Sequence, residues 1–572
     1  MRGWDELNMR IEVRNQVKNK DEKKENLMGM EQGYTSIDRK YTCLIDGSID
    51  NLDQLAKKLK KAGIYLKGDR PEEVVIELYR FSGTGIWEEL QGHYAMVIYN
   101  HKTEELTALR DPYGAKQLYY RLGHQGIEFG TELRTFQPTA LNKEAMHQYF
   151  SFHYVPEDGT PFQDVYHVPS GCILTYKNGR DVEILPYADL TLIHGSSHSL
   201  VTPCRMRKVM TETIYDQLQQ AQKVGIRLTG HVSDVALASI TKYATSELKA
   251  FFFHCEGTDS EEEKYIQKVA EELEMKLTYL NVTPQAYIQA TKEALTHLYT
   301  PIADREMPLQ FLFFQTVSNK VDAVLSLDGG KELFGYDHAY KVQHRLESIA
   351  NRTNATRRRL LQLAKHSPNR LKRLLLQGCL PLSSHYPGNT EFDLSTLLNW
   401  KGSSWKNVTN PLYKEISDLD WLEQMQTIDL NLRLKASTLL QTNVLSKANN
   451  VEVKRPFLDE KIVEIANDLT KAEKLGERKK KPLLMEAFKH DVPEYVRSSK
   501  KKTSSVPLAK WLREDLYEDV HRLFNDPIAK EWINLDMANQ MLLTHRLKKG
   551  EFSQEIWTVA VFIMWLKERS RT

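Results

Sequence analysis

The strongest constraint on the fold is a regular alternation of apolar strands and amphipathic helices over residues 204–282. Strand patterns occur at 224–230, 248–255 and 276–282. Helix patterns precede each of these strands, at 204–223, 234–244 and 260–275. Such alternation is typical of βαβ units and a parallel sheet. After residues 321–330 the remaining pattern is mostly helical. We therefore predict an α/β domain over residues 200–572, with a parallel sheet and a helical C-terminal part.

A different pattern precedes this domain. Short strand patterns at 41–50, 93–100 and 105–111 are interspersed with amphipathic helix patterns at 51–63 and 71–83, and Pro71 suits the first turn of a helix. This is an α+β module, predicted over residues 41–195, with residues 1–40 set apart as a divergent N-terminal segment. Small and polar residues around position 195 indicate a linker between the two domains.

Composition excludes several classes of partner and compartment. The 572 residues exceed what one hydrophobic core usually supports. The 78 basic and 76 acidic residues nearly cancel, which argues against nucleic acid as a partner. Five cysteines without C-x-x-C spacing argue against a disulfide framework or a zinc site. Without an apolar run of about eighteen residues or a signal peptide, we expect no membrane partner and a cytoplasmic protein.

Segments in both halves carry a family resemblance. The first half contains RDPYGAKQLYY at residues 110–120 and FGTEL at 129–133. The second contains LTGHVSD at 228–234, LSLDGGKELFGY at 325–336 and VEVKRPFLD at 451–459. In this order they resemble the asparagine synthetase family, with its β-lactam synthetase and lasso peptide cyclase relatives. The resemblance implies a glutaminase-like (Ntn-type) α+β domain, then an ATP-pyrophosphatase-type (HUP-like) α/β domain that uses ATP and Mg²⁺.

The same resemblance implies that the first domain does not hydrolyse glutamine. A class II glutaminase uses an N-terminal cysteine whose free amine activates its thiol, but residue 2 is Arg2 and the first cysteine is Cys43. The family's Asn-Gly oxyanion pair is Asp46-Gly47 here, and a carboxylate would repel the oxyanion. The aspartate that holds the glutamine amine falls at Pro71, and the arginine-rich segment before it is missing. The domain then serves as a scaffold or as a recruited peptide-binding unit.

The first nucleotide loop follows the strand at 224–230. A strand that ends in a glycine-containing loop and opens a helix presents backbone N–H groups to an anion. By the resemblance, Leu228, Thr229, Gly230, Ser233 and Asp234 are expected to bind ATP. Hydroxyl and carboxylate have exchanged places relative to the family's S-G-G-x-D-S loop. Asp234 is therefore the predicted magnesium ligand.

The second loop carries a change of charge. By the resemblance, Ser326, Gly329 and Gly330 bind the nucleotide, and Asp328 takes the first of two acidic positions. Lys331 replaces the second acid, which removes a hard oxygen ligand and adds a fixed cation. Two interpretations follow. Either Lys331 neutralises phosphate charge, or metal binding is lost and the site is inactive.

Two basic segments are further candidates. Lys501, between Lys500 and Lys502, matches the family's catalytic lysine, which stabilises an acyl-adenylate transition state. With Asp328 and Lys331 it completes the predicted catalytic set, although adjacent lysines also occur in solvated loops. The basic stretch 351–377 is interpreted as a solvated amphipathic helix pair, or as a patch that faces a peptide or phosphate.

The resulting functional expectation is an ATP-dependent amide-bond-forming enzyme that activates the carboxylate of a peptide or small molecule. By analogy with the relatives, a lasso-type macrolactam cyclase is preferred, because there the peptide supplies its own amine. Its partners would be a precursor peptide and the leader-binding and peptidase proteins that process it. The alternatives are an ammonia-dependent asparagine synthetase and a non-catalytic partner protein.

Overall fold

The computed structural model divides the chain into two compact units. The first unit contains Met1–Met146 and Val155–Leu190, and the second contains His147–Tyr154 and Thr191–Thr572. The structure describes residues 10–14, 27–28, 33–123, 126–138, 140–157, 159–177, 182–188, 201–258, 260–350, 352–364, 369–382, 386, 394–399, 410–476, 482–498 and 506–570.

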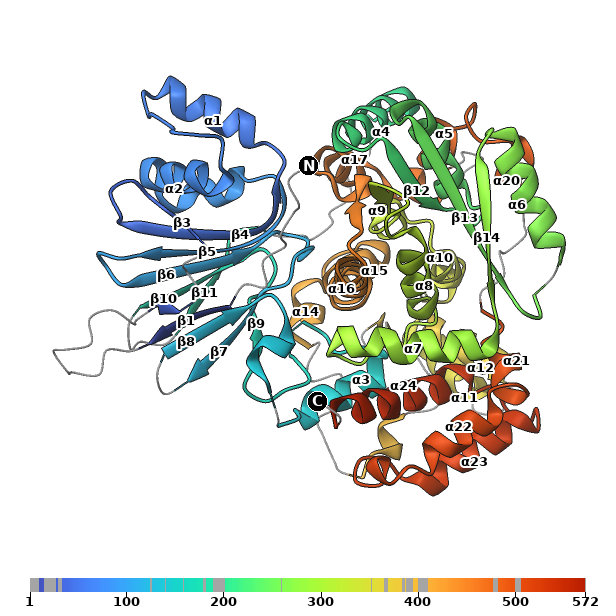
Figure 1. Ribbon diagram of the computed structural model, residues 1–572. Helices are drawn as coiled ribbons and strands as arrows, with labels where there is room; N and C mark the ends of the chain where they lie inside the picture. Colours follow the sequence, from blue (N-terminus) through green and yellow to red (C-terminus); the bar gives the residue numbers. More distant parts are fainter. Residues whose placement is uncertain are drawn as a thin grey trace. The chain divides into compact units, whose positions relative to one another are not determined.

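The first unit is built on two antiparallel sheets (Figure 1). One has the order β2-β1-β8-β7-β9 and the other β11-β10-β6-β5-β4-β3. The strands are β1 Arg10–Arg14, β2 Leu27–Met28, β3 Tyr34–Thr35, β4 Tyr41–Ile49, β5 Gly92–Asn100, β6 Glu105–Arg110, β7 Tyr119–Gly123, β8 Gly126–Gly130, β9 Tyr166–His167, β10 Cys172–Lys177 and β11 Glu183–Pro186. The sequence analysis set residues 1–40 apart, whereas β1, β2 and β3 are strands of these sheets.

Alternation along β4 explains how the sheets and helices pack. Leu44 joins a buried cluster with Val97 of its own sheet and Phe129 of the other sheet. Its neighbour Cys43 points to the opposite face and joins the cluster formed with α1 (Leu52–Lys61) and α2 (Pro71–Ser82). Successive side chains of a strand face opposite sides. The apolar residues on one face of β4 thus pack against the other sheet, and those on the opposite face pack against the helices.

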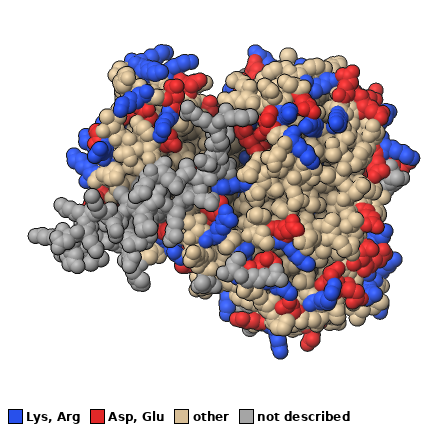
Figure 2. All heavy atoms as spheres, in the orientation of Figure 1, with Lys and Arg blue, Asp and Glu red and all other residues tan. Residues whose placement is uncertain are grey.

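Helix α1 has one buried and one charged face. Leu55 and Leu59 are buried against the sheet, whereas Lys57, Lys60 and Lys61 are exposed. Figure 2 shows these basic side chains gathered over α1. Helix α2 begins at Pro71, as predicted. Proline lacks a backbone N–H group, and in the first turn of a helix this group has no partner within the helix.

The second unit contains the predicted parallel sheet, in the order β14-β13-β12-β15-β16. Its strands are β12 Lys223–Arg227, β13 Glu247–Cys255, β14 Lys276–Val282, β15 Ala323–Leu325 and β16 Glu452–Lys454, and all neighbouring pairs are parallel. The chain builds outward from β12 to β14, then returns to the other side of β12 with β15. This reversal makes a topological switch point between β12 and β15.

Helices surround this sheet and form the C-terminal part (Figure 1). The early ones are α3 Lys143–Phe152, α4 Pro203–Leu218, α5 Val232–Ala244, α6 Ser260–Glu272, α7 Pro284–Leu298, α8 Met307–Val317, α9 Gly330–Phe334, α10 His338–Ala350, α11 Asn354–Ala364 and α12 Asn369–Cys379. The later ones are α14 Asn410–Glu415, α15 Trp421–Ile428, the π-helix η6 Asp429–Leu439, α16 Leu440–Ala448, α17 Glu460–Asp468, α18 Lys471–Leu475, α19 Leu483–Ala487, α20 Glu494–Ser498, α21 Leu508–Arg513, α22 Tyr517–Phe524, α23 Leu535–Arg546 and α24 Ser553–Arg569.

Two regions of this helical part relate to the sequence analysis. The basic stretch 351–377 forms most of the pair α11 and α12, which pack on each other as predicted. Helix α24 lies in the core, with Trp557, Phe562 and Trp565 fully buried. Across the part of the chain that the structure describes, helices with the length and apolarity to span a bilayer are lacking.

Candidate active site

The parallel sheet brings the two predicted nucleotide loops together. Strand β12 pairs with β15 through Ile226 and Leu325, so the loops that follow them leave the sheet side by side. The amide of Leu228 donates to Phe251, and the amide of Ser326 donates to Lys454 at 2.9 Å, which anchors each loop to its neighbouring strand. Open α/β sheets bind ligands at the carboxyl ends of strands flanking a topological switch point. Both loops lie at that position.

The first loop needs glycine at position 230. Gly230 has a φ of +78°, and a Cβ there would lie 2.5 Å from a ring carbon of Tyr265. The Tyr265 hydroxyl also donates to the Gly230 carbonyl at 3.2 Å. Only glycine tolerates both the left-handed backbone and this close approach. Gly230 therefore shapes the turn from β12 into α5.

Asp234 braces the first loop from inside. Its side chain is fully buried, and its Oδ2 accepts from the hydroxyl of Thr229 at 2.6 Å and from the Thr229 amide. Burial raises the pKa of Asp234 although these two hydrogen bonds oppose the shift. The carboxylate thus holds the first loop through Oδ2, whereas its Oδ1 is buried without a hydrogen-bond partner among the described residues.

The magnesium-ligand role predicted for Asp234 stays a prediction. Magnesium requires several oxygen ligands in octahedral geometry, and Asp234 directs one oxygen to Thr229. Within the described ranges, no group of three or more His, Cys, Asp or Glu residues could hold a metal.

Tyr336 connects the two loops, a role that the sequence analysis missed. An interaction with the side chain of Ser233, at the start of α5, lowers the pKa of Tyr336 and partly opposes the effect of burial. The Tyr336 hydroxyl lies 2.7 Å from where a Cβ on Gly330 would be, and the Phe457 ring lies 3.0 Å from the same point. Gly330 is therefore required so that two aromatic side chains can approach the second loop. Burial raises the pKa of Tyr336, which keeps its phenol neutral.

In the second loop, the acidic Asp328 and the basic Lys331 have different surroundings. The Asp328 carboxylate lies 3.5 Å from Nε of Arg455, and both side chains are largely buried. Gly329 adopts a φ of +84° where a Cβ would clash with Leu458. Lys331 is 44% exposed, and its Nζ lies 3.9 Å from Oε1 of Glu332. Asp328 is therefore held in an ion pair, whereas Lys331 extends toward solvent.

Beside Lys331 lies a charged cluster that the sequence analysis did not anticipate. We call Glu332, Asp337, Asp429 and Arg433 the Arg433 cluster. The Nη2 atom of Arg433 lies 3.2 Å from Glu332, 3.5 Å from Asp337 and 3.4 Å from Asp429. Glu332 and Asp429 are fully buried. The four residues come from α9, the turn after it and the π-helix η6, so one guanidinium ties three segments together.

Two tyrosines complete the surroundings of Asp429. The hydroxyls of Tyr340 and Tyr386 both donate to its Oδ2, each at 2.5 Å. Burial nevertheless raises the pKa of Asp429, against the opposing effects of Arg433 and the two hydroxyls. The carboxylate is therefore under-compensated in its buried position.

The predicted catalytic Lys501 lies outside the described residues, as do Lys500 and Lys502. Its proposed role at the acyl-adenylate stays a prediction. The other predicted residues of the site, Leu228 to Asp234 and Ser326 to Lys331, all lie in the two loops or in the first turn of the following helix.

In the first unit, the predicted oxyanion position is closed by an ion pair. The Asp46 carboxylate lies 3.1 Å from Nζ of Lys116, and Asp46 is buried. Cys43, three residues earlier on β4, is fully buried, and burial raises the pKa of its thiol well above the usual value. A buried neutral thiol is a poor nucleophile. Neither residue provides the chemistry of glutamine hydrolysis.

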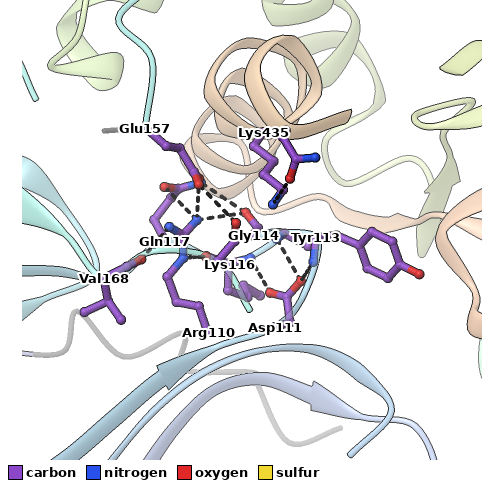
Figure 3. Close-up of polar contacts among 12 residues, drawn as sticks. Arg110, Asp111, Tyr113, Gly114, Lys116, Gln117, Glu157, Val168 and Lys435 are labelled. Carbon is purple, nitrogen blue, oxygen red and sulfur yellow. Dashed lines mark hydrogen bonds and ion pairs between the residues drawn. The ribbon is translucent and has the colours of Figure 1, made fainter. Parts of the chain in front are cut away.

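Arg110 holds segment 110–120 together (Figure 3). Its guanidinium is fully buried, and it donates to the carbonyls of Lys116 at 2.7 Å and Val168 at 2.8 Å. It also donates to Oε1 of Glu157 at 2.9 Å and to the Gly114 carbonyl at 3.1 Å. Arg110 therefore has a structural role, because its donors are directed at carbonyls and at the largely buried carboxylate of Glu157.

Asp111 acts in the same segment as a turn-forming acceptor. Its carboxylate accepts from the amides of Tyr113 at 3.1 Å, Ala115 at 3.0 Å and Lys116 at 3.1 Å (Figure 3). Aspartate often stabilises turns through such bonds to backbone amides. The Arg-Asp pair of this motif is therefore structural.

Comparison with known proteins decides the family. A family model described as asparagine synthase matches residues 205–567, and one described as a glutamine amidotransferase domain matches residues 26–187. This chain belongs to the asparagine synthase family. This family consists of ATP-dependent amide synthases. The amidotransferase match begins upstream of residue 41, in agreement with the strands found there.

Curated relatives of this asparagine synthase family member cover most of its length. It is 28% identical over 547 residues to asparagine synthetase (glutamine-hydrolyzing) 1 of Bacillus subtilis (strain 168), which spans 92% of this chain and 85% of the relative. It is 25% identical to a putative asparagine synthetase (glutamine-hydrolyzing) of Mycobacterium tuberculosis (strain ATCC 25618 / H37Rv), over 92% of this chain and 84% of the relative. It is 22% identical to amidase chyE of Penicillium rubens (strain ATCC 28089 / DSM 1075 / NRRL 1951 / Wisconsin 54-1255), over 82% and 77% respectively.

Proposed function

We propose that this protein activates a carboxylate with ATP and joins it to an amine that does not come from glutamine. In the first step the carboxylate attacks the α-phosphate, and pyrophosphate leaves to give an acyl-adenylate. In the second an amine attacks the acyl carbon, AMP leaves, and the amine loses a proton. The observation that carries the proposal is the contrast between two retained loops at the switch point and the Asp46–Lys116 ion pair in the first unit.

The residues of the second unit support the first step in distinct ways. The turn after β12 opens α5, and the second loop opens α9, so backbone N–H groups at both helix starts suit phosphate oxygens. Lys331 supplies a fixed cation at the second loop. In this proposal it stabilises the charge of the leaving pyrophosphate. Lys501 would stabilise the acyl phosphate at the same step.

The first unit supports a different source of the amine. In a glutaminase an oxyanion needs neutral or positive donors, whereas Asp46 brings a carboxylate that already binds Lys116. The substrate then has to provide the amine itself. We favour a lasso-type macrolactam cyclisation, in which an Asp or Glu side chain of a peptide is activated and its N-terminal amine closes the ring. This choice rests on the family resemblance, since the residues themselves do not identify a peptide.

The proposal is tested by following both halves of the reaction in one tube. The full chain is incubated with ATP, glutamine and either L-aspartate or synthetic peptides with interior Asp or Glu residues. We expect AMP and pyrophosphate with a peptide and no release of glutamate. Formation of asparagine from L-aspartate and ammonium chloride would instead support an ammonia-dependent synthetase.

A non-catalytic role is the second candidate, favoured by the charges of the loops. Asp234 is turned inward to Thr229, and Lys331 stands at an acidic position of the family. Calorimetry with ATP, together with ATP–pyrophosphate exchange, separates the two candidates. Failure of the wild-type chain both to bind ATP and to catalyse exchange would favour the non-catalytic role.

A further inference from the structure

We infer that the Arg433 cluster binds the protonated primary amino group of the amine substrate. This inference rests on the proposed function and names a site for its second reactant. The cluster consists of Glu332, Asp337, Asp429 and Arg433, as defined above. Its ligand class is a primary ammonium group, which carries one positive charge and three N–H donors.

The charges of the cluster leave room for one more cation. Three carboxylates face Arg433, and the next cation is Lys331, whose Nζ reaches only to 3.9 Å from Glu332. Even with both cations counted, one negative charge is uncompensated. Burying an unpaired charge is costly in free energy. A bound monocation would balance the set.

Hydrogen-bonding capacity indicates what kind of cation fits. Glu332 places Oε1 toward Arg433, and Asp429 receives Arg433 and two tyrosine hydroxyls at Oδ2. Among the described residues, the remaining oxygens, Oε2 of Glu332 and Oδ1 of Asp429, are buried without a hydrogen-bond partner. Buried acceptors normally have donors. An ammonium group supplies such donors, whereas a potassium ion supplies none.

The cluster is also placed beside the nucleotide loops. Glu332 is two residues beyond Gly330, within the same short helix α9. Glu332 and Asp429 form the closed end, with no exposed surface, whereas Asp337 and Arg433 are 20% and 30% exposed. Lys331 is more exposed still. The outer edge of the cluster, at Asp337 and Arg433, is thus open to solvent, next to the loops that would hold the acyl-adenylate.

The π-helix η6 explains how Asp429 and Arg433 reach one site. They lie four residues apart and contact each other at 3.4 Å within an eleven-residue π-helical segment. Such segments are rare and occur frequently at functional sites. The helix places both side chains against Glu332, about a hundred residues earlier in the chain.

Binding is tested on the full chain with methylammonium chloride as the probe. The shift of the melting temperature is measured against concentration, with potassium chloride at equal ionic strength as the comparison. We expect a saturable stabilisation by methylammonium that exceeds that by potassium. Asp429→Asn should weaken the apparent affinity for methylammonium at least tenfold, and the less buried Asp337→Asn provides the same test if Asp429→Asn does not fold.

Asp418→Asn is the matched control, because Asp418 is exposed and carries no contact with the cluster. It should bind methylammonium as the wild type does. Equal stabilisation by potassium and methylammonium would overturn the inference in favour of a simple cation site. Unchanged affinity in both cluster variants would overturn it as well.

A kinetic measurement separates this inference from the proposed function. In Asp337→Asn, the apparent KM for the amine should rise about tenfold, while ATP–pyrophosphate exchange changes less than twofold. A parallel loss of exchange and amide formation would mean that the cluster only positions the second loop, and would overturn the inference. If the wild type shows no exchange, the proposed function fails, and the methylammonium titration still decides whether the cluster binds an amine.

Discussion

The two units differ in how the charges of their buried side chains are compensated. In the first, the carboxylate at Asp46 is matched by Lys116, and the donors of Arg110 are directed at carbonyls and Glu157. In the second, Arg433 faces three carboxylates, and buried oxygens of Glu332 and Asp429 have no partner in the described part of the chain. In the proposed function, the first unit keeps its fold without glutamine hydrolysis because its charges are satisfied internally. In the proposed amine site, the unsatisfied charges of the second unit bind a ligand.

The largest expected effect tests whether the buried charges of the first unit are compensated within that unit. Arg110→Met removes a buried guanidinium that donates to Glu157 and to several carbonyls. Removing one partner of a buried ion pair costs about 3–5 kcal/mol. We expect this loss in the free energy of unfolding, measured by denaturant titration with fluorescence. Arg134→Met is the control, because Arg134 is half exposed and pairs with Glu132; it should cost less than about 1 kcal/mol. Similar losses in both variants would contradict a structural role for Arg110.

The second prediction tests whether Lys331 takes part in the reaction at the nucleotide loops. Lys331→Ala should lower the rate of ATP–pyrophosphate exchange on the order of a hundredfold, because it removes a cation that stabilises the transition state. Lys331→Asp, which restores the family residue, should also be harmful, since Ser233 does not supply the companion acid. The control is Lys320→Ala, an exposed lysine before β15. A change of less than twofold in Lys331→Ala would remove Lys331 from the catalytic set.

Sequence reasoning located the loops but not how their side chains face. Alternating strands and helices were enough to predict the parallel sheet, and the strand order brings the loop at Gly230 beside that at Gly330. The inward turn of Asp234 could not be predicted, because it depends on hydrogen bonds to Thr229 that form only in the folded loop. The bridge from Tyr336 to Ser233 was missed for the same reason.

Long-range ion pairs were beyond the sequence as well. Asp328 meets Arg455, and Glu332 meets Arg433, across more than a hundred residues. Charge alone does not specify such partners, since acidic and basic residues are almost equally numerous throughout the chain. The strand β1 was missed although RIEVR alternates charged and β-branched residues as a strand does, because a pattern of five residues is short. Its partner β8 supplies the pairing that the local sequence does not reveal.

The third prediction concerns pH and applies to both units. Burial lowers the pKa of His167 in the first unit and of His153 in the second from 6.5 to about 4. The folded protein then binds fewer protons than the unfolded chain between these values, so stability falls as pH drops from about 6.5 to about 4. We expect the melting temperature to decline over this window, and His167→Gln to flatten the decline for the first unit. A melting temperature that is constant from pH 7 to 4 would contradict both assignments.

The smallest expected effect concerns the ion pair itself. Asp46→Asn restores the amide of the family motif but leaves Cys43 buried, so glutaminase activity should not appear. Lys116 keeps 23% of its side chain exposed, so the loss of the pair should change the free energy of unfolding by less than about 1 kcal/mol. Glutamate release is measured alongside unfolding. Release that depends on this variant would show that the ion pair alone silences the first unit.

The most direct test of the account is a product analysis of one reaction. The full chain is incubated with ATP, glutamine and the panel of Asp- and Glu-containing peptides, and AMP, ADP, pyrophosphate and glutamate are quantified together. The account predicts AMP and pyrophosphate in equal amounts with an accepted peptide, and no glutamate above a protein-free control. ADP as the nucleotide product, or glutamate formed in step with AMP, would contradict it.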